Sequence, residues 1–117
     1  MHFNKLVLVL LAAVSAPSVF AAVSDSCNYS LTQKGVCLPT SSCVANNANE
    51  SASFVKGKCP NDPSSVMCCL KTIKTPNGKN VLGLTKYVTG KCLNINDCKG
   101  QMKTGLCPGN GNVRFCY

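Results

Sequence analysis

Cysteine is the most abundant side chain of this sequence with strong covalent or metal-binding chemistry. Ten cysteines occur among 117 residues, and all of them follow residue 21. At this density, thiols in a short chain form either a disulfide framework or thiolate metal sites. Residues 1–21 distinguish the two, because Lys5, the apolar run Leu6 to Val14 and a small-residue end at Ala21 are typical of a secretory signal peptide. Export favours oxidation, so we expect disulfides and no metal site.

The apolar run of this signal peptide is too short to span a bilayer, which needs about 20 residues. We therefore predict cleavage after Ala21, an extracellular protein and no transmembrane segment. Cleavage also removes His2, the only histidine, which leaves no imidazole for Ser-His-Asp or Cys-His catalysis. Four acids remain, and a two-carboxylate hydrolase is the one enzymatic alternative that they allow: Asp25, Glu50, Asp62 and Asp97. We predict a protein that is not an enzyme and needs no cofactor.

Positive charge is concentrated in the second half of the chain. Residues 22–70 carry three lysines against three acids, whereas residues 71–117 carry seven lysines and one arginine against Asp97 alone. Such asymmetry indicates either a polyanionic or membrane-surface partner or a solubilising coat. Nucleic acid is an unsuitable partner, because the chain is exported and has few aromatic residues for base stacking. The predicted polyanion-binding residues are Lys71, Lys74, Lys79, Lys86, Lys91, Lys99, Lys103 and Arg114.

The cysteines are arranged as an internal repeat. The first copy runs Gly35-x-Cys37, five residues, Cys43, a variable stretch, Cys59-Pro60 and Val66-x-Cys68-Cys69. The second runs Gly90-x-Cys92, five residues, Cys98, a shorter stretch, Cys107-Pro108 and Val113-x-Phe115-Cys116. This register predicts a tandem duplication, with a six-cysteine module at 22–70, a linker or exposed hairpin at 71–84 and a four-cysteine module at 85–117.

Two cysteines of the first copy have no counterpart in the second. In the alignment Phe115 stands opposite Cys68, and counting back from the paired glycines places Leu82 opposite Cys27. If Cys27 bonds Cys68, their joint loss leaves no free thiol in the second copy. Moving the single-residue gap favours a bond from Cys27 to Cys69 instead, so both pairings stay open. In either case we expect Phe115 to fill the core.

The pattern of a first cysteine, Gly-x-Cys-x5-Cys, a further cysteine and Val-x-Cys-Cys resembles the clip domain. That six-cysteine module accompanies secreted serine proteases of arthropod immune cascades. The pattern is also similar to cysteine-rich accessory modules of secreted fungal and protist proteins. No protease or hydrolase domain follows in this sequence, so the resemblance implies a framework and not an activity. The clip resemblance implies the bonds Cys27–Cys68, Cys37–Cys59 and Cys43–Cys69, then Cys92–Cys107 and Cys98–Cys116 in the reduced copy.

Short segments rich in β-favouring residues predict the strands that carry these cysteines. We expect strands near residues 35–38, 55–59, 66–70, 87–93 and 113–117, separated by Gly, Pro and Asn. Residues 44–53 are expected to form either one or two helical turns or a solvated loop. Each glycine two residues before a cysteine is expected to allow a bulge or a close approach between strands. The predicted fold class is a small disulfide-rich protein of short antiparallel strands.

Two N-glycosylation sequons lie in the first module, at Asn28 and Asn49, and Asn49 is the better candidate because its loop should be exposed.

Three classes of function agree with the sequence. The favoured one is a secreted binding or effector-like protein that acts on an anionic polymer, a cell-wall glycan or a host protein. The alternatives are a cationic antimicrobial protein and a protease inhibitor whose loop Lys99–Leu106 presents Lys103. The sequence carries no signal for an oligomeric state.

Overall fold

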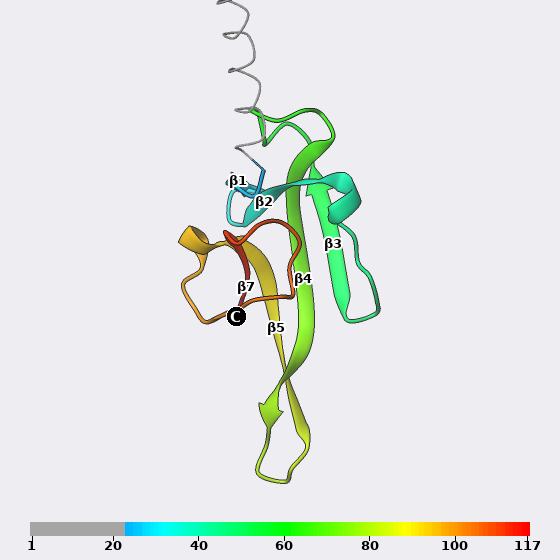
Figure 1. The fold of residues 1–117 in the computed structure, drawn as a ribbon, viewed down its shortest axis with the longest axis vertical. Coiled ribbons are helices and arrows are strands. Elements are labelled where there is room, and N and C mark those ends of the chain that lie inside the picture. The colour runs from blue at the N-terminus through cyan, green and yellow to red at the C-terminus, as the bar shows by residue number, and fades with distance from the viewer. Residues whose placement is uncertain (1–22) are drawn as a thin grey trace, which may run out of the picture.

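The computed structural model describes residues 23–117, so the predicted signal peptide lies outside the described residues. The described chain consists of antiparallel strands with two 3₁₀ turns, η2 and η3, and five disulfides (Figure 1). This confirms the predicted fold class. The elements are β1 (Ser26–Asn28), β2 (Lys34–Pro39), η2 (Thr40–Ser42), β3 (Glu50–Val55), β4 (Val66–Lys79), β5 (Thr85–Asn94), η3 (Ile95–Asp97), β6 (Met102–Lys103) and β7 (Val113–Cys116).

Strand β4 organises the sheet. Cys68 and Cys69 pair with both β2 and β3, whereas Thr72 and Ile73 pair with both β3 and β5. A strand has only two hydrogen-bonding edges, so β2 and β5 lie end to end along one edge of β4 and β3 lies along the other. Strand β1 continues the sheet beyond β2, and β7 and β6 continue it beyond β5. The β4–β5 hairpin extends away from the other strands at one end of the molecule (Figure 1).

The core consists of two clusters on opposite faces of β4, because successive side chains of a strand alternate between faces. One cluster is built around Cys68 and the other around Cys69. The second cluster contains buried residues of both halves, so the two predicted modules share one core as well as one sheet. The members of the smaller cluster are Cys27, Cys37, Cys59, Val66 and Cys68. Those of the larger one are Val36, Leu38, Cys43, Cys69, Ile73, Cys92, Val113 and Phe115.

Corresponding strands of the two halves pair in the same register. The residue after Gly35 pairs with Cys69, and the residue after Gly90 pairs with Cys116. Both glycines are buried against the backbone of the partner strand. A Cβ on Gly35 would stand 2.6 Å from the Cys69 carbonyl oxygen, and one on Gly90 would overlap the Cys116 carbonyl oxygen and lie 2.8 Å from the Phe115 ring. These two glycines therefore provide the close strand approach that the Gly-x-Cys pattern predicts.

The register corrects one step of the sequence alignment. Cys27 pairs with Gly35, whereas the residue paired with Gly90 is Ile73 and not Leu82. Leu82 lies in the loop of the β4–β5 hairpin, whose paired strands are longer than those of the β1–β2 hairpin in the first half. Ile73 and Phe115 are both buried in the larger cluster, at 4% and 0% exposed. An apolar pair therefore takes the place of a disulfide, and the predicted core role of Phe115 is confirmed.

Three further local predictions are corrected in part by the structure. Residues 71–79 are not a linker but the distal part of β4, so the boundary expected after Leu70 falls inside a strand. The alternative of a hairpin describes residues 71–84 correctly, with a loop at 80–84. Residues 44–49 form a loop, one of the two expected options, whereas residues 50–53 belong to β3 because they pair along the free edge of β4. The strand expected at 55–59 ends at Val55, since Gly57 adopts φ 79° and turns the chain.

The close approach at Gly90 predicts a large effect of a single methyl group. Gly90→Ala should lower the free energy of unfolding by about 2 kcal/mol, because overpacking against backbone atoms cannot be relieved by a rotamer change. Gly111→Ala is the matched control, since a Cβ at Gly111 meets no atom within 4 Å. Denaturant unfolding of both variants measures the difference. Equal stability of the two variants would contradict the assigned strand register.

Candidate functional site

Three basic side chains lie together on one face of the sheet. Lys91 pairs with Thr72 of β4 and with Cys116 of β7, and residues directly opposite each other share a face. Alternation then places Lys74, two residues from Thr72, and Arg114, two residues from Cys116, on that same face. Lys74 and Arg114 are thus diagonal neighbours of Lys91, at roughly 7–8 Å. The opposite face carries Ile73, Cys92 and Phe115 of the core.

Polar and aromatic residues complete this surface. By the same alternation Tyr87 and Thr89 of β5 lie beside Lys74, and Tyr87 pairs directly with Pro76. The Lys74 Nζ lies 5.4 Å from the centroid of the Tyr87 ring, and Tyr87 is 52% exposed. We call the set Thr72, Lys74, Tyr87, Thr89, Lys91 and Arg114 the basic face. Sequence reasoning did not identify Tyr87 as part of a site, because only the strand pairing brings it next to the cations.

The basic face has the groups needed to bind an anionic polymer. Arg114 uses its Nε to donate to the Gly111 carbonyl oxygen at 3.1 Å, which orients the guanidinium and leaves its other donors for a ligand. A guanidinium binds carboxylate, sulfate or phosphate through paired donors, and an ammonium binds them as a point charge. The Tyr87 ring supplies an apolar surface with a polar hydroxyl at its tip. The three cations, two threonine hydroxyls and one ring lie on extended strands, with Lys74 exposed and Lys91 and Arg114 half-buried.

The assignment of Lys71 to the polyanion-binding set is corrected by the structure. Lys71 is 3% exposed and lies on the same face of β4 as Ile73, not on the basic face. Its Nζ forms an ion pair with Glu50 Oε1 at 3.1 Å. The hydrogen bond from the Asn46 backbone N–H holds the pKa of Glu50 below its ordinary value of 4.5, and Lys71 lowers it further against the opposing effect of burial. Lys71 is therefore a buried partner of Glu50, because the pairing of β3 with β4 places Glu50 diagonally opposite it.

The remaining predicted cations are dispersed. Lys79 and Lys86 are exposed near the end of the β4–β5 hairpin, and Lys99 is exposed after η3. Lys103 of β6 is half-buried, donates to the Pro76 carbonyl oxygen at 3.4 Å and lies 5.7 Å from the Tyr117 ring centroid. The eight predicted residues thus do not form one patch. The structure brings together only Lys74, Lys91 and Arg114 across neighbouring strands.

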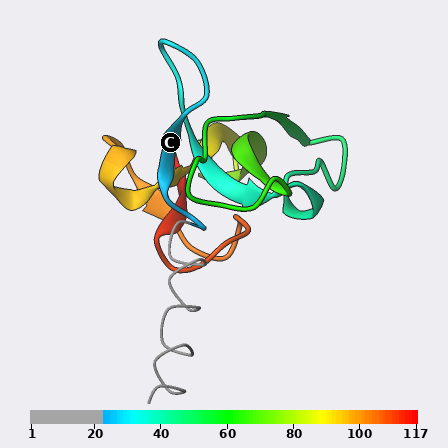
Figure 2. The same cartoon turned by 90° about the horizontal axis from the view of Figure 1, so that it is seen from above.

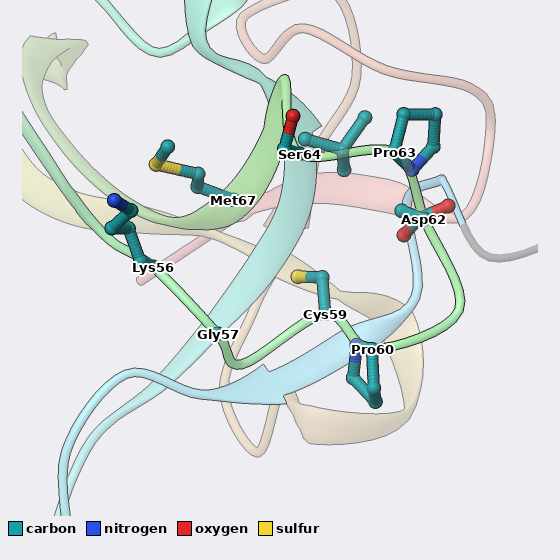
Figure 3. A pocket seen from close by; sticks show the side chains of 9 residues that line it. Lys56, Gly57, Cys59, Pro60, Asp62, Pro63, Ser64 and Met67 are labelled. Carbon is teal, nitrogen blue, oxygen red and sulfur yellow. The ribbon is translucent and has the colours of Figure 1, made fainter.

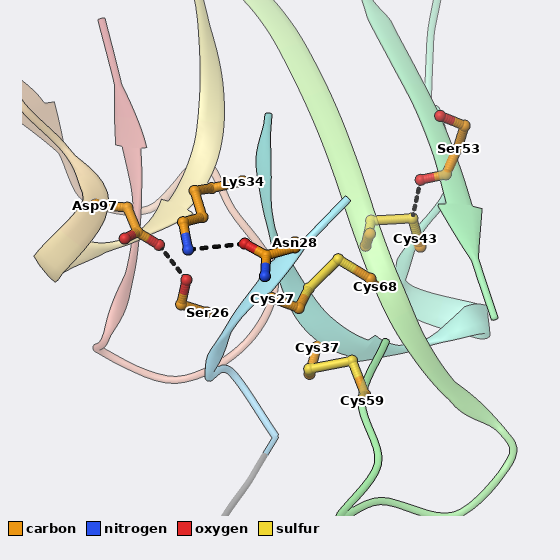
Figure 4. The surroundings of a disulfide bond; sticks show 11 residues. Ser26, Cys27, Asn28, Lys34, Cys37, Cys43, Ser53, Cys59, Cys68 and Asp97 are labelled. Atoms are coloured by element: carbon orange, nitrogen blue, oxygen red, sulfur yellow. Dashed lines mark hydrogen bonds between the residues drawn. A yellow bond between two sulfur atoms is a disulfide. The ribbon is translucent and has the colours of Figure 1, made fainter. Parts of the chain in front are cut away.

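All ten cysteines lie within the described residues and are bonded in pairs. The pairs are Cys27–Cys68, Cys37–Cys59, Cys43–Cys69, Cys92–Cys107 and Cys98–Cys116, the same as those that the clip resemblance implied. The sulfur atoms of Cys27, Cys37 and Cys59 lie within 4.8 Å of one another, where two disulfides pack side by side (Figure 4). Disulfide sulfur carries no thiolate charge, so this cluster is covalent structure and not a set of metal ligands.

Both predicted glycosylation residues are on the surface. Asn28 is exposed in β1, where its side-chain oxygen accepts a hydrogen bond from the Lys34 Nζ at 2.8 Å (Figure 4). Asn49 is exposed in the turn before β3, and its backbone carbonyl accepts from the Lys74 N–H at 2.8 Å. The amide side chain of Asn49 is thereby held at the surface by a well-anchored backbone. Glycosylation of Asn49 remains the stronger prediction of the two.

A cavity of about 280 Å³ lies in the first half, next to the Cys37–Cys59 bond (Figure 3). Its lining includes Pro60, Asp62 and Met67. Neither carboxylate oxygen of Asp62 has a hydrogen-bond partner among the described residues, and both are buried. Burial raises the pKa of Asp62 above its ordinary value of 3.8, and the nearby Asp25 carboxylate raises it further. A buried carboxylate without a hydrogen-bond partner costs stability, and we assign that cost to Asp62.

Comparison with known proteins identifies one informative relative. A protein of Arthroderma benhamiae, described as an uncharacterized secreted protein, is 28% identical over 97 residues. The alignment covers 82% of this chain but 33% of that protein, so the chain spans about a third of the relative's length. No family model and no solved structure matches the sequence. Within residues 23–117 there is also no helix with the length and hydrophobicity required to cross a membrane.

The buried ion pair predicts a contrast between two neighbouring lysines. Lys71→Met should lower the free energy of unfolding at neutral pH by about 3 kcal/mol, because it leaves the Glu50 carboxylate without its cation. The folded-state pKa of Glu50 is lowered, so this stabilisation is present above pH 4.5 and is lost as the pH falls below it. Lys74→Met on the exposed face should change stability by less than about 0.5 kcal/mol. Urea unfolding at neutral and acidic pH measures both; equal effects would place Lys71 at the surface.

The unpartnered carboxylate predicts an opposite dependence on pH. The folded-state pKa of Asp62 is raised, so its protonated form favours folding below pH 3.8 and this contribution is lost as the pH rises. Asp62→Asn should therefore unfold at a higher temperature than the parent protein at neutral pH and at nearly the same temperature near pH 3. Asp25→Asn should produce a smaller gain in the same direction. Calorimetry at several pH values provides the test, and a destabilised Asp62→Asn at neutral pH would refute the assignment.

Proposed function

We propose that this chain is a secreted, non-enzymatic binding protein that holds an anionic polymer, such as an acidic cell-wall glycan, on the basic face. Three features support secretion: the signal-peptide pattern of residues 1–21, the five disulfides, and the similarity to a protein described as secreted. The observation that carries the binding proposal is the diagonal row of Lys74, Lys91 and Arg114 across β4, β5 and β7.

The extended strands hold these cations at fixed separations. A polymer with regularly repeated carboxylate, sulfate or phosphate groups can contact several of them at once, so weak contacts add through multivalency. The Tyr87 ring, next to Lys74, lies where a sugar ring of the polymer can pack. Each exposed charge contact contributes at most about 1 kcal/mol in water. The proposed binding is therefore of modest strength, and it depends on the row of cations and not on a single residue.

Within residues 23–117, no acidic side chain forms an ion pair with a cation of the basic face. Glu50 is paired with Lys71, and Asp97 accepts a hydrogen bond from the Ser26 hydroxyl (Figure 4). Asp62 lies in the first-half cavity, with Asp25 close enough to affect its pKa. The cations of the basic face are thus not neutralised by the four acids of the described chain. A ligand that supplies anionic groups is the partner with complementary charge.

The protease-inhibitor alternative is less well supported by the structure. An inhibitory lysine must project from an exposed loop into the specificity pocket of the protease. Lys103 instead lies in β6, and its Nζ contacts the Pro76 carbonyl oxygen and the Tyr117 ring of its own sheet. The loop Lys99–Leu106 has one other lysine, Lys99. Lys99 is exposed, but the inhibitor hypothesis assigned the contact with the protease to Lys103.

Heparin affinity chromatography of the mature protein tests the proposal. A Lys74→Gln, Lys91→Gln, Arg114→Gln variant should elute at a clearly lower salt concentration than the parent protein, because three adjacent contacts are lost. The matched control replaces the exposed Lys34, Lys56 and Lys58 of the first half by Gln. It removes the same charge and should elute close to the parent protein.

Both variants should be made in the full chain, because β4 joins the two halves and a fragment would cut the shared core. Binding should weaken steeply with salt, since exposed charges are screened over about 8 Å at 0.15 M. Equal losses in the two variants would show that net charge alone causes retention. Unchanged elution of the basic-face variant would show that the proposed site is not used.

A further inference from the structure

The loop of the β4–β5 hairpin exposes three large apolar side chains. Val81 is 101% exposed, Leu82 is 79% exposed and Leu84 is 61% exposed. The hairpin carries them to the end of the described chain that lies farthest from β1 and β2 (Figure 1). Single exposed apolar residues are common, but a contiguous group at a projecting tip indicates an interaction site. We call Val81, Leu82 and Leu84 the apolar tip.

The backbone of this loop is closed by its own hydrogen bonds. The side-chain oxygen of Asn80 accepts from the N–H groups of Leu82 at 2.9 Å and of Leu84 at 3.0 Å. The Asn80 backbone donates to the Leu84 carbonyl oxygen at 2.8 Å and accepts from the Gly83 N–H at 3.0 Å. Gly83 adopts φ 81°, a conformation that glycine tolerates. The N–H groups of Leu82, Gly83 and Leu84 therefore need no hydrogen bond from water.

The hydrogen bonds within the loop affect whether the tip can leave water. An unpaired backbone N–H or C=O is costly to transfer into hydrocarbon, which excludes most loops from the membrane interior. Three of the four N–H groups that follow Asn80 already have partners within the loop. The part of the transfer cost that comes from these three N–H groups is thereby reduced, and three apolar side chains favour the transfer.

Positive charge lies directly behind the apolar tip. Lys79 ends β4 and Lys86 lies at the start of β5, and both are exposed. The only acid of the second half, Asp97, accepts a hydrogen bond from the Ser26 hydroxyl. Apolar residues at the end and ammonium groups one step behind match the order of acyl chains and anionic headgroups in a lipid leaflet. Charge complementarity thus favours an anionic lipid surface as the occupant.

We propose that the apolar tip inserts shallowly into an anionic lipid bilayer, with Lys79 and Lys86 at the level of the headgroups. The site consists of different residues from the basic face, so it goes beyond the proposed polymer binding and does not depend on it. A second copy of the chain is a less suitable occupant, because contact between two tips would bring their lysines together. Insertion of the hairpin end leaves the disulfide-linked core and the basic face outside the membrane.

Vesicle co-sedimentation of the mature protein tests this proposal. Vesicles of phosphatidylcholine that contain phosphatidylglycerol should bind the protein, and pure phosphatidylcholine vesicles should bind it much less. Val81→Ser, Leu82→Ser and Leu84→Ser together should weaken partitioning by at least about tenfold, since all three side chains leave water on insertion. Lys79→Gln and Lys86→Gln should each weaken it by about fivefold. Leu31→Ser is the matched control, because Leu31 is 105% exposed in the β1–β2 turn, and it should have no effect.

The absence of tryptophan from the sequence gives a direct probe of insertion. In Leu82→Trp, the single indole should shift its fluorescence to shorter wavelength on mixing with anionic vesicles and be quenched by brominated lipid. Leu31→Trp should show neither change. The substituted side chains are exposed, so the variants should keep the parent's thermal unfolding temperature, which is measured alongside.

Three results would overturn the proposal. The first is no binding to anionic vesicles, and the second is equal binding by the serine triple variant, which would indicate surface charge without insertion. The third is a tip-dependent dimer in sedimentation without lipid, which would identify a second copy as the occupant. Heparin retention of the serine triple variant separates the two sites. It should equal that of the parent protein, whether or not the tip binds lipid.

Discussion

Disulfides from two consecutive residues hold β4 from opposite faces, and β2, β3 and β5 pair along that strand. Cys68 bonds to Cys27 and Cys69 bonds to Cys43, and neighbouring strand residues point to opposite sides of a sheet. The bonds close sequence separations of 41 and 26 residues, which stabilises the fold by roughly 3–4 kcal/mol each in the chain-entropy description. With β4 clamped in this way, β2, β3 and β5 can pair along its two edges.

The second half replaces part of this covalent framework by packing. Ile73 and Phe115 stand where Cys27 and Cys68 stand in the first half, and both are buried in a cluster that also contains Val36 and Leu38. The second half therefore relies on apolar residues of the first for its core. Polar contacts reinforce this dependence: the Asn94 side chain donates to the Ser24 carbonyl oxygen at 3.0 Å, and the Ser24 hydroxyl accepts from the Asn110 N–H at 3.2 Å.

The shared core ends at Ile73 on β4, so most of the β4–β5 hairpin is exposed. Beyond Ile73, β4 pairs with β5, and the side chains from Lys74 to Leu84 are exposed or half-buried. The basic face lies on one side of the strands at the base of the hairpin, and the apolar tip lies at the end of the hairpin. Both proposed surfaces are positioned by the clamped part of the same strand. A rigid strand pair that presents cations at its base and apolar residues at its end is suited to a secreted protein that binds charged surfaces.

Much of the framework could be predicted from the order of residues, because it depends on short-range patterns. The cysteine repeat placed equivalent cysteines in each half, the Gly-x-Cys pattern located the close strand approaches, and the alignment identified Phe115 as core. These features depend on the spacing of residues along the chain, and the strands within each copy pair in a register that follows this spacing. The clip resemblance added a pairing scheme, and the same five bonds are present in the structure. The strands near residues 35–38, 66–70, 87–93 and 113–117 were also predicted, whereas β1 around Cys27 was not and the strand expected at 55–59 ends at Val55.

The position of each lysine could not be predicted in this way, because burial and cross-strand neighbours depend on pairing between segments far apart in the chain. Lys71 and Lys74 look alike in any local window, yet β3 buries Lys71 against Glu50 while Lys74 faces solvent beside Tyr87. The count back to Leu82 failed for the same reason, since the paired strands of the β4–β5 hairpin are longer than those of the β1–β2 hairpin, which the repeat does not show. Sequence spacing thus specified which residues could be linked, and the register of β4 with its neighbours specified which of them meet at a surface.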